Sequence, residues 1–466
     1  MNKSYHFIGI GGIGMSALAS LLLDKGFKVS GSDVRTNPVI DRLKKQGAEI
    51  FLGHASQNID GSDCIVFSSA ISNSNPELME AQKKQIPILQ RAKLLAELMR
   101  GHIGITIAGA HGKTTTSSMI ANLLVMAGFR PTTAVGGIVS GSNSHAQLGK
   151  GKYFVTEVDE SDGSFLYFLP HYSVITNIDF EHIDYYRNWQ NILAAYKKFI
   201  GQTVEDGIIL GYGDDERLLK LLKESKKNFK TYGFSPQNDF YPAQIAFNQF
   251  ESRFHCMSDG KDLGQVILNT PGKHNVANAL ACISLGLNLS IDFDVICNSL
   301  KEYRGVQRRF QLKGVVDDIW VIDDYAHHPT EIRAILDTAQ LFKQSLPGQG
   351  NELITVFQPH RYSRVKGLMI EFAESLIQSD HLIVTDIYAA SENPIDGITA
   401  ENLCEKIRER SNKPVHYVSK EGIVDYLLEI VKPQDIVMTL GAGDITNIAD
   451  QFINTLKQQS SIVEKA

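Results

Sequence analysis

The sequence predicts an α/β fold made of three domains. Short apolar runs alternate with segments of helical periodicity, which is typical of parallel sheets whose strands are joined by helices. Several of these runs end in glycines or polar residues, as strands do at the ligand-binding edge of such sheets. At 466 residues the chain also exceeds what one hydrophobic core usually holds. We expect domains at residues 1–98, 99–313 and 314–466.

The composition limits the classes of function. Apolar residues make up 43% and charged residues 21% of the chain, as in a globular protein. A net charge of −6 argues against nucleic-acid binding, and no segment is apolar and long enough to cross a membrane. The five cysteines lack CxxC spacing, so neither a zinc site nor a disulfide framework is indicated. We therefore expect a cytoplasmic protein with no nucleic-acid or membrane partner.

The first domain opens on a glycine turn. A strand expected at 7–10 runs into the pattern G-x-G-x-x-G at 9–14, and a helix follows. The next strand, at 28–32, delivers Asp33 about twenty residues after the glycines, the spacing of a Rossmann-like unit. This pattern predicts a nucleotide diphosphate near the glycines and a ribose hydroxyl at Asp33. It does not distinguish NAD from another nucleotide.

Two further strands extend this domain. They are expected at 48–52 and 64–67, and they lead to His54 and to the small residues that begin at Ser68. The small residues either approach a ligand or cap the next helix, and both interpretations stay open. A helix at 91–100 then leads into the second domain.

The second domain opens on another phosphate-binding pattern. An apolar strand ends in a glycine turn with a lysine, and a helix starts directly after it. The backbone N–H groups and the helix N-terminus of such a turn bind phosphate, while Lys113 can reach the outer phosphates and Thr114 can hold Mg²⁺. The residue six positions before the lysine is Ile107, so this turn is shorter than a Walker A motif. The alternative is an ordinary glycine turn with a lysine by chance.

Acidic residues follow the next two strands. After the strand at 153–158, four acids between residues 157 and 162 suit either a Mg²⁺ site beside Thr114 or a solvated loop. The strand at 174–178 leads into a second acidic run with His182, which either serves a second cation or is structural. After about residue 205 the pattern favours short strands and turns.

A helix is expected to begin near His274. His274, Asn275 and Asn278 share its first turn, where amides either read the edge of a base or cap the helix. The paired arginines that follow at 308 and 309 are close to the expected linker to the third domain, and such pairs are commonly surface residues.

The third domain is expected to be a second Rossmann-like unit. Polar residues follow each of its expected strands, at 319–322, 353–357, 381–385 and 436–440. This pattern is typical of an open parallel sheet that binds ligands at the carboxyl edge. After the second strand, Arg361 and Arg364 offer a fork for a small carboxylate.

Two phosphate-binding turns and a carboxylate fork together predict a ligase. ATP with Mg²⁺ suits the turn of the second domain, and a nucleotide-linked substrate suits the turn of the first. The chemistry requires that a carboxylate is activated as an acyl phosphate before an amine displaces the phosphate.

The same motifs resemble the Mur ligase family of peptidoglycan synthesis. The resemblance covers all three domains in the family's order and rests on residues 9–17, 109–115, 157–162, 177–184, 274–279, 324–329 and 359–364. It implies an ATP-dependent ligase of cell-wall biosynthesis that joins L-alanine to the lactyl carboxylate of UDP-N-acetylmuramate. It also implies that the enzyme uses two Mg²⁺ ions, which Mn²⁺ can replace. The expected oligomeric state is a monomer or a weak homodimer.

The resemblance further implies roles for individual residues. The UDP-linked substrate would contact Gly11, Gly12, Ile13, Gly14, Asp33, His54, Ser68, Ser69 and Ala70. ATP would contact Gly109, Ala110, His111, Gly112, Lys113, Thr114, Thr115, His274, Asn278 and Arg309. The metal ions would be held by Thr114, Glu157 and His182, and the amino acid by Tyr325, His327, Arg361 and Arg364. The catalytic residues would be Lys113, Glu157, His182 and His327, the last as a candidate base for the amine.

Three other functions compete with this expectation. A related recycling ligase attaches a whole tripeptide to the same sugar nucleotide, but the motif at 359–364 favours free alanine. An NAD-dependent dehydrogenase would contain the phosphate-binding turn of the second domain only by chance. A non-catalytic nucleotide-binding regulator would not need the lysine, threonine, acid and histidine together. The sequence also shows no match for the modified lysine of some Mur relatives, and it has Glu181 where the family often has aspartate.

Overall fold

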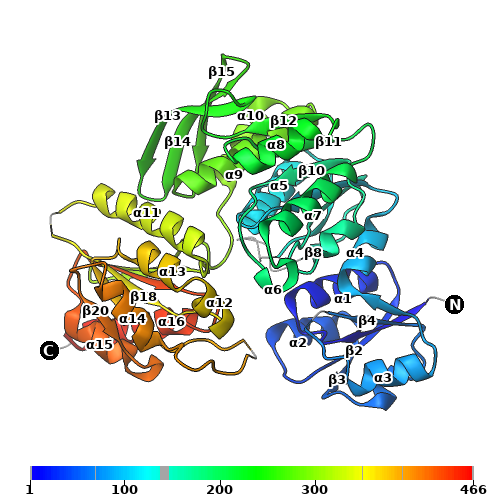
Figure 1. Ribbon diagram of the computed structural model, residues 1–466, viewed down its shortest axis with the longest axis horizontal. Coiled ribbons are helices and arrows are strands. Elements are labelled where there is room, and N and C mark those ends of the chain that lie inside the picture. Colours follow the sequence, from blue (N-terminus) through cyan, green and yellow to red (C-terminus); the bar gives the residue numbers. More distant parts are fainter. Residues whose placement is uncertain (1–2, 69, 137–145, 349, 391, 464–466) are drawn as a thin grey trace. The chain divides into compact units, whose positions relative to one another are not determined.

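The computed structural model describes residues 3–68, 70–136, 146–348, 350–390 and 392–463. They form three sheets with helices between the strands, which confirms the predicted three-domain α/β fold (Figure 1). The chain groups into two compact units. One contains residues 1–243, 255–266 and 277–304, and the other contains residues 244–254, 267–276 and 305–466. The predicted domain boundaries stay predictions.

The first sheet is a parallel Rossmann-like sheet of strand order β3-β2-β1-β4-β5. The order reverses beside β1, and in such sheets the crevice at the carboxyl ends of the strands on either side of the reversal binds the ligand. Its elements are β1 (Ser4–Ile8), α1 (Ile13–Asp24), β2 (Lys28–Asp33), α2 (Pro38–Lys45), β3 (Glu49–Leu52), η1 (Ser56–Ile59), β4 (Cys64–Phe67), α3 (Pro76–Lys83), β5 (Ile88–Gln90) and α4 (Arg91–Met99).

The second sheet has the strand order β15-β14-β13-β12-β11-β10-β6-β9-β7-β8. In it β6 is parallel to both β10 and β9, so the glycine turn after β6 lies at the same edge as the acidic runs after its neighbours. The strands are β6 (Ile103–Ala108), β7 (Thr132–Ala134), β8 (Ala146–Gln147), β9 (Tyr153–Glu157), β10 (Tyr172–Ile175), β11 (Ile208–Tyr212), β12 (Phe229–Tyr232), β13 (Phe240–Asn248), β14 (Glu251–Ser258) and β15 (Lys261–Leu268). The helices are α5 (Lys113–Met126), η2 (Ser164–Tyr167), α6 (Ile183–Tyr186), α7 (Trp189–Gly201), α8 (Glu216–Glu224), α9 (Lys273–Asn288) and α10 (Phe293–Glu302).

The expectation of only short strands and turns after residue 205 is wrong for α8. The Asp215 side chain caps this helix by accepting hydrogen bonds from the N–H groups of Arg217 and Leu218. Its Leu218 and Leu222 side chains are fully buried, so one apolar face stabilises a helix that the surrounding turn-rich sequence obscures.

The third sheet has the strand order β16-β17-β21-β18-β19-β20, in which β16 is antiparallel to β17 and the other neighbours are parallel. The strands are β16 (Gln311–Val316), β17 (Ile319–Asp324), β18 (Leu353–Phe357), β19 (His381–Val384), β20 (Val415–Tyr417) and β21 (Ile436–Leu440). The helices are α11 (Pro329–Ser345), α12 (Tyr362–Gly367), α13 (Met369–Leu376), α14 (Ala400–Arg408), η3 (Lys420–Gly422), α15 (Ile423–Ile430) and α16 (Thr446–Val463). Two hydrophobic clusters flank this sheet, since alternate residues of β18 and β21 belong to different clusters.

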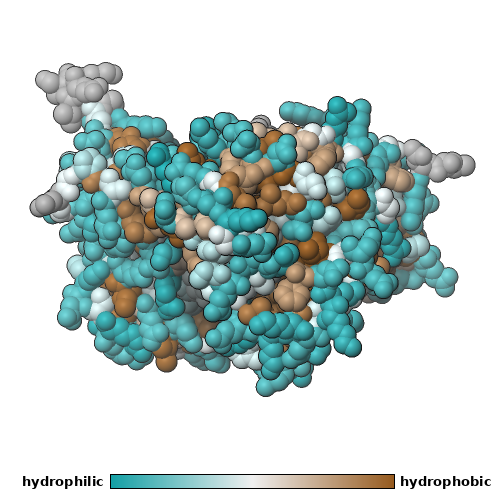
Figure 2. Space-filling view, turned by 90° about the horizontal axis from the view of Figure 1, so that it is seen from above, coloured by the Kyte–Doolittle hydropathy of each residue, from teal (hydrophilic) through white to brown (hydrophobic). Residues whose placement is uncertain are grey.

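One face of the molecule is mainly polar. On the face shown in Figure 2, hydrophilic residues predominate and hydrophobic residues are interspersed among them. Among the described residues, no helix is long and apolar enough to cross a membrane.

We predict that Gly31→Ala destabilises the first domain. A Cβ atom at Gly31, in the middle of β2, would lie 2.6 Å from Ile10 Cδ1 and 2.7 Å from the carbonyl oxygen of Phe7. The Phe7 oxygen belongs to the backbone of β1 and cannot shift without distorting that strand. The free energy of unfolding should therefore fall by about 1–3 kcal/mol in urea titrations. Gly201→Ala is the control, because a Cβ atom there meets nothing within 4 Å. Equal stability of the two variants would contradict the packing described here.

Candidate active site

The glycine turn of the first domain is held by the end of β2. The Ser32 carbonyl accepts hydrogen bonds from the N–H groups of Gly9 (2.8 Å) and Ile10 (3.0 Å). The Asp33 carboxylate accepts one from the N–H of Gly11 at 2.9 Å. Asp33 thus supports the turn itself, a contact that the sequence did not suggest. Its predicted contact with a ribose stays a prediction.

The other residues predicted for this site lie around the same turn. Gly12 is the N-cap of α1, Ile13 and Gly14 begin that helix, and Ile13 is half exposed. His54 Nδ1 lies 2.9 Å from Ser32 Oγ. Ser68 and Ala70 follow β4 in a turn and do not cap the next helix, because Asn75 caps α3. This removes the capping alternative for Ser68 and Ala70, while Ser69 lies outside the described residues.

The glycine turn of the second domain needs two glycines for geometric reasons. Gly109 has φ +128° and Gly112 has φ +82°, both in the region that favours glycine. A Cβ atom at Gly109 would lie 2.1 Å from Thr176 Oγ1. Gly112 precedes the first residue of α5, so the N-terminus of that helix faces the turn as the sequence predicted.

Lys113 is paired with Glu160. The Lys113 Nζ atom lies 2.9 Å from both carboxylate oxygens of Glu160, and it also donates to the carbonyls of Gly109 and Ala110. Burial alone would lower the pKa of Lys113, but the charges of Glu160 and Asp159 outweigh burial and raise it. The lysine therefore stays charged. The sequence did not single out Glu160, because the resemblance assigned Glu157 of the same acidic run to the metal.

Glu160, Glu181 and His182 form a cluster with the ligand types of a divalent cation. One ligand atom from each lies within 4.8 Å of those of the other two. His182 Nε2 is 3.5 Å from Glu160 and 3.7 Å from Glu181. Burial would lower the pKa of His182, but the hydrogen bond and charge of Glu160 outweigh it and raise the pKa. The negative charge gathered here suits a cation next to the lysine.

Thr114 and Glu157 are adjacent, as predicted. Thr114 Oγ1 donates to Glu157 at 2.9 Å, and Ser117 Oγ donates to the other carboxylate oxygen at 2.8 Å. The N–H of Gly136 adds a third hydrogen bond at 2.7 Å. Glu157 therefore binds Thr114, Ser117 and Gly136, whereas Glu160 binds Lys113. The predicted metal ligation by Thr114 and Glu157 stays a prediction.

Three more residues assigned to ATP lie around this turn. His111 Nε2 lies 2.8 Å from Asp179, and Thr115 is buried within α5. Asn278 accepts a hydrogen bond from Thr116 Oγ1 at 3.1 Å, and a Cβ atom at Gly112 would lie 2.7 Å from its side-chain oxygen. Asn278, which is distant in sequence, thereby lies against the start of α5, and its predicted contact with ATP stays a prediction.

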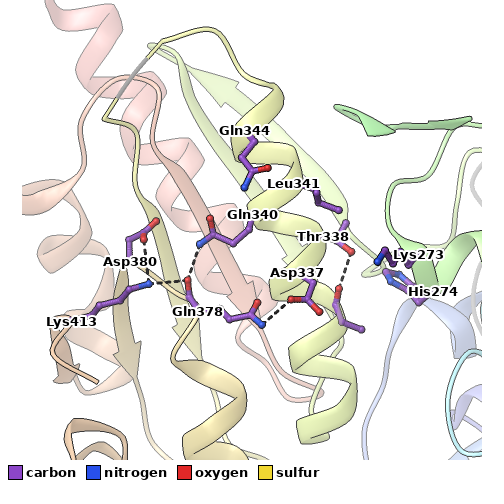
Figure 3. Close-up of a pocket in the computed structure, with 11 residues that line it drawn as sticks. Lys273, His274, Asp337, Thr338, Gln340, Leu341, Gln344, Gln378, Asp380 and Lys413 are labelled. Atoms are coloured by element: carbon purple, nitrogen blue, oxygen red, sulfur yellow. Dashed lines mark hydrogen bonds and ion pairs between the residues drawn. The ribbon is translucent and has the colours of Figure 1, made fainter. Parts of the chain in front are cut away.

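His274 and Arg309 belong to the other compact unit. His274 lines a polar pocket of about 660 Å³, with Lys273 beside it at one end and Lys413 at the other (Figure 3). Burial, followed by the charge of Arg309, lowers the pKa of His274 to about 4, so its ring is neutral. Several polar groups of the pocket form hydrogen bonds with one another. For example, the Gln378 amide donates to Asp337 at 2.8 Å.

The predicted amino-acid site is a chain of rings at the carboxyl edge of the third sheet. The ring centroids of Tyr325 and His327 are 5.3 Å apart, and those of His327 and His360 are 5.6 Å apart. His360 stacks on Tyr388 with an interplanar angle of 10°. The Arg364 guanidinium donates to His360 Nδ1 at 3.1 Å. The structure thus adds His360 and Tyr388, which the sequence did not single out.

Positive charge gathers around His360. Burial, followed by the charges of His327, Arg364 and Arg361, lowers the pKa of His360 to about 3. A neutral ring can then accept the hydrogen bond from Arg364. Arg361 is the N-cap residue of α12, and its N–H donates to the Tyr388 carbonyl at 2.9 Å. Both predicted arginines are therefore close to one imidazole, while their contact with a carboxylate stays a prediction.

Three family profiles match the chain. They are described as "Mur ligase family, catalytic domain" at residues 4–103, "Mur ligase middle domain" at 107–286, and "Mur ligase, glutamate ligase domain" at 308–443. Together they confirm the resemblance seen in the motifs.

The chain is similar to full-length relatives. A protein of Geotalea uraniireducens (strain Rf4) named UDP-N-acetylmuramate–L-alanine ligase is 46% identical over 98% of both chains. One of the same name from Geobacter sulfurreducens is 43% identical, again over 98% of both. Among solved structures, UDP-N-acetylmuramate-alanine ligase MurC of Thermotoga maritima matches with a TM-score of 0.81 at 30% identity, covering 98% of this chain and 99% of that one. A murein peptide ligase of Psychrobacter arcticus 273-4 shares the fold, with a TM-score of 0.71 at 23% identity and coverage of 98% and 99%.

We predict that Glu160→Gln tightens nucleotide binding in the absence of metal and removes the gain in affinity that Mg²⁺ gives the wild type. Without metal, the substitution removes a negative charge that would repel phosphate and that neutralises Lys113. Nucleotide binding in a chelator should therefore tighten, on the order of tenfold. With Mg²⁺, the variant should lose the further gain in affinity that metal gives the wild type. Titration calorimetry measures both, and a variant that responds to Mg²⁺ as the wild type does would contradict this assignment.

Proposed function

Because the chain belongs to the Mur ligase family, we propose that it joins L-alanine to the lactyl carboxylate of UDP-N-acetylmuramate with hydrolysis of ATP. The observation that carries the proposal is the group of charges at the second-domain turn. There Lys113 faces Glu160, and Glu160 also belongs to a cluster with Glu181 and His182. Relatives that bear this activity in their names match almost the whole chain.

We assign the UDP part of the substrate to the glycine turn of the first domain. The N-terminus of α1, which follows this turn, suits a diphosphate. His54, Ser68 and Ala70 lie around the same crevice, and Ser69 stays part of this proposal from the sequence alone.

We assign ATP to the second-domain turn, with Lys113 at the γ-phosphate. Glu160, Glu181 and His182 fit one divalent cation, and Thr114 with Glu157 fits a second. Bound Mg²⁺, or Mn²⁺ in its place, would supply charge stabilisation for the transferring phosphoryl oxygens. His274 and Asn278 are proposed to lie by the adenine, and Arg309 is proposed to contact ATP.

We assign L-alanine to the ring chain of the third domain. Arg361 and Arg364 suit its carboxylate, since their charges converge on His360. His327 Nδ1 lies 3.0 Å from the Tyr325 carbonyl, which can only accept a hydrogen bond, so Nδ1 carries the proton. When the His327 ring is neutral, Nε2 is its basic nitrogen, which supports His327 as the base that takes a proton from the alanine ammonium.

The proposed reaction has two steps. The lactyl carboxylate oxygen attacks the γ-phosphorus of ATP, the bond to the bridging oxygen breaks, and ADP leaves. The alanine amine then attacks the carbonyl of the acyl phosphate, and the tetrahedral intermediate expels phosphate. Lys113 balances the charge on the transferring phosphoryl group in the first step. We further propose that the enzyme is cytoplasmic and acts as a monomer or weak homodimer.

The second candidate function is attachment of a tripeptide to the same sugar nucleotide. It is favoured by the fold that the chain shares with the murein peptide ligase. Phosphate release with UDP-N-acetylmuramate, ATP and a panel of L-alanine, glycine, L-serine and the tripeptide separates the two. Turnover should be highest with L-alanine, although one methyl or hydroxyl group limits the discrimination. Turnover with the tripeptide alone would overturn the proposal.

Lys113→Ala is expected to abolish turnover while the binding of UDP-N-acetylmuramate survives. The lysine serves the second-domain turn only, whereas the UDP part is assigned to the first domain. Phosphate release and calorimetric binding measure the two properties separately. Lys220→Ala is the control, since Lys220 is exposed on α8. Equal loss of turnover and substrate binding would show that the two sites are misplaced.

Arg361→Ala is expected to raise the KM for L-alanine roughly tenfold to hundredfold, because a charge-assisted contact with the carboxylate is lost. The KM for ATP should change little. Steady-state kinetics with each substrate varied in turn measure this. Arg333→Ala, an exposed arginine of α11, serves as the control. An unchanged KM for L-alanine would remove Arg361 from the carboxylate site.

A further inference from the structure

The buried carboxylate of Glu77 contacts Ser32, the residue whose carbonyl supports the glycine turn of the first domain. Glu77 is fully buried, although it carries a charge that is costly to bury without partners. It is in the first turn of α3, behind the N-cap residue Asn75, where the helix N-terminus favours an anion. Burial opposes the charged form, but contacts with His6, Ser32 and Asn58 outweigh it and lower the pKa of Glu77 to about 2. The proposed reaction gives this anion no role.

One oxygen of Glu77 organises the segment that carries His54. Glu77 Oε1 accepts hydrogen bonds from Asn58 Nδ2 at 2.7 Å and from the N–H of Ala55 at 3.3 Å. Asn58 also donates to the carbonyl of Gly53 at 3.2 Å. The backbone on both sides of His54 is thereby tied to one carboxylate.

The other oxygen, Oε2, lies 3.4 Å from His54 Nδ1 and also reaches the ring through Ser32. Ser32 Oγ donates to Glu77 Oε2 at 2.6 Å, and the same hydroxyl oxygen lies 2.9 Å from His54 Nδ1. A hydroxyl has one hydrogen, and an ionised carboxylate only accepts. The hydrogen of Ser32 is therefore directed at Glu77, and Ser32 Oγ must accept from His54. Nδ1 of His54 carries a proton, and Nε2 of the neutral ring is an acceptor.

We propose that Glu77 is a positioning residue of the UDP-substrate site, which acts through Ser32 to hold His54 as the Nδ1–H tautomer. In this form Nε2 offers an acceptor to an N–H or O–H group of the nucleotide. Ser32 also supports the glycine turn, because its carbonyl accepts from Gly9 and Ile10. One residue therefore links the buried carboxylate both to the turn and to the histidine. The inference rests on the proposed function, which assigns the nucleotide to this crevice.

Glu77→Gln makes the inference testable, because it keeps the shape and reverses one hydrogen bond. If the amide oxygen keeps the bonds from Asn58 and Ala55, the NH₂ group faces Ser32 and must donate to it. The Ser32 hydroxyl then turns its hydrogen toward His54 Nδ1. The His54 ring becomes the Nε2–H tautomer, and its outer nitrogen changes from acceptor to donor.

The first measurement is the tautomer of His54 by ¹⁵N–¹H NMR of the full chain, with its signals assigned by their loss in His54→Ala. We expect Nδ1–H in the wild type and Nε2–H in Glu77→Gln. The control is Glu80→Gln on the same helix, where Glu80 pairs with Lys83 and Lys84. It should keep the wild-type tautomer. Nε2–H in the wild type would overturn the inference even if Glu77→Gln does not fold.

The second measurement is steady-state kinetics. Glu77→Gln should raise the KM for UDP-N-acetylmuramate roughly tenfold or more, since a buried polar contact is mismatched. The kcat and the KM values for ATP and L-alanine should stay within about twofold. In a His54→Ala background, Glu77→Gln should raise the KM no further. An equal rise in that background would show that Glu77 acts only on stability and would overturn the inference. If the wild type shows no turnover with these substrates, the proposed function fails, whereas the tautomer result stands independently.

Discussion

The contact between Lys113 and Glu160 is the interaction on which the central site depends. Because β6 lies between β9 and β10, the lysine that follows β6 meets acids that follow each neighbour. Glu160 faces the ammonium group and also lies within reach of His182. The same carboxylate can therefore neutralise the lysine or hold a cation. A phosphate that binds with its metal would exchange one set of contacts for the other.

The parts of the fold that local patterns encode could be predicted from the sequence. Strand β18 has the expected bounds, because its residues are apolar except for Thr355 and polar residues border them on both sides. Strand β1 was expected at 7–10 but spans Ser4–Ile8. Its start was missed because His6 is polar, yet His6 is fully buried and contacts Ser30 and Glu77. A polar residue with a buried partner breaks the periodicity from which strands are predicted.

The partners within the site could be predicted only in part. The glycines and Lys113 were recognisable because their conformation and spacing are local. The choice of Glu160 among neighbouring acids depends on the course of one loop, and the contact of Ser32 with Glu77 joins residues 45 positions apart. The stacking of His360 on Tyr388 likewise results from neighbouring strand ends of one sheet. Such pairs follow from tertiary packing, which no short-range pattern contains.

The proposed reaction combines three ligand sites that share one structural logic, since each lies where parallel strands end. Its central claim is that a carboxylate oxygen of the sugar nucleotide is transferred to phosphate. UDP-N-acetylmuramate with oxygen-18 in its lactyl carboxylate tests this directly, by mass spectrometry of the phosphate released in the presence of ATP and L-alanine. The account predicts one oxygen-18 atom in each phosphate formed. Unlabelled phosphate would contradict the acyl-phosphate route and the role given to Lys113.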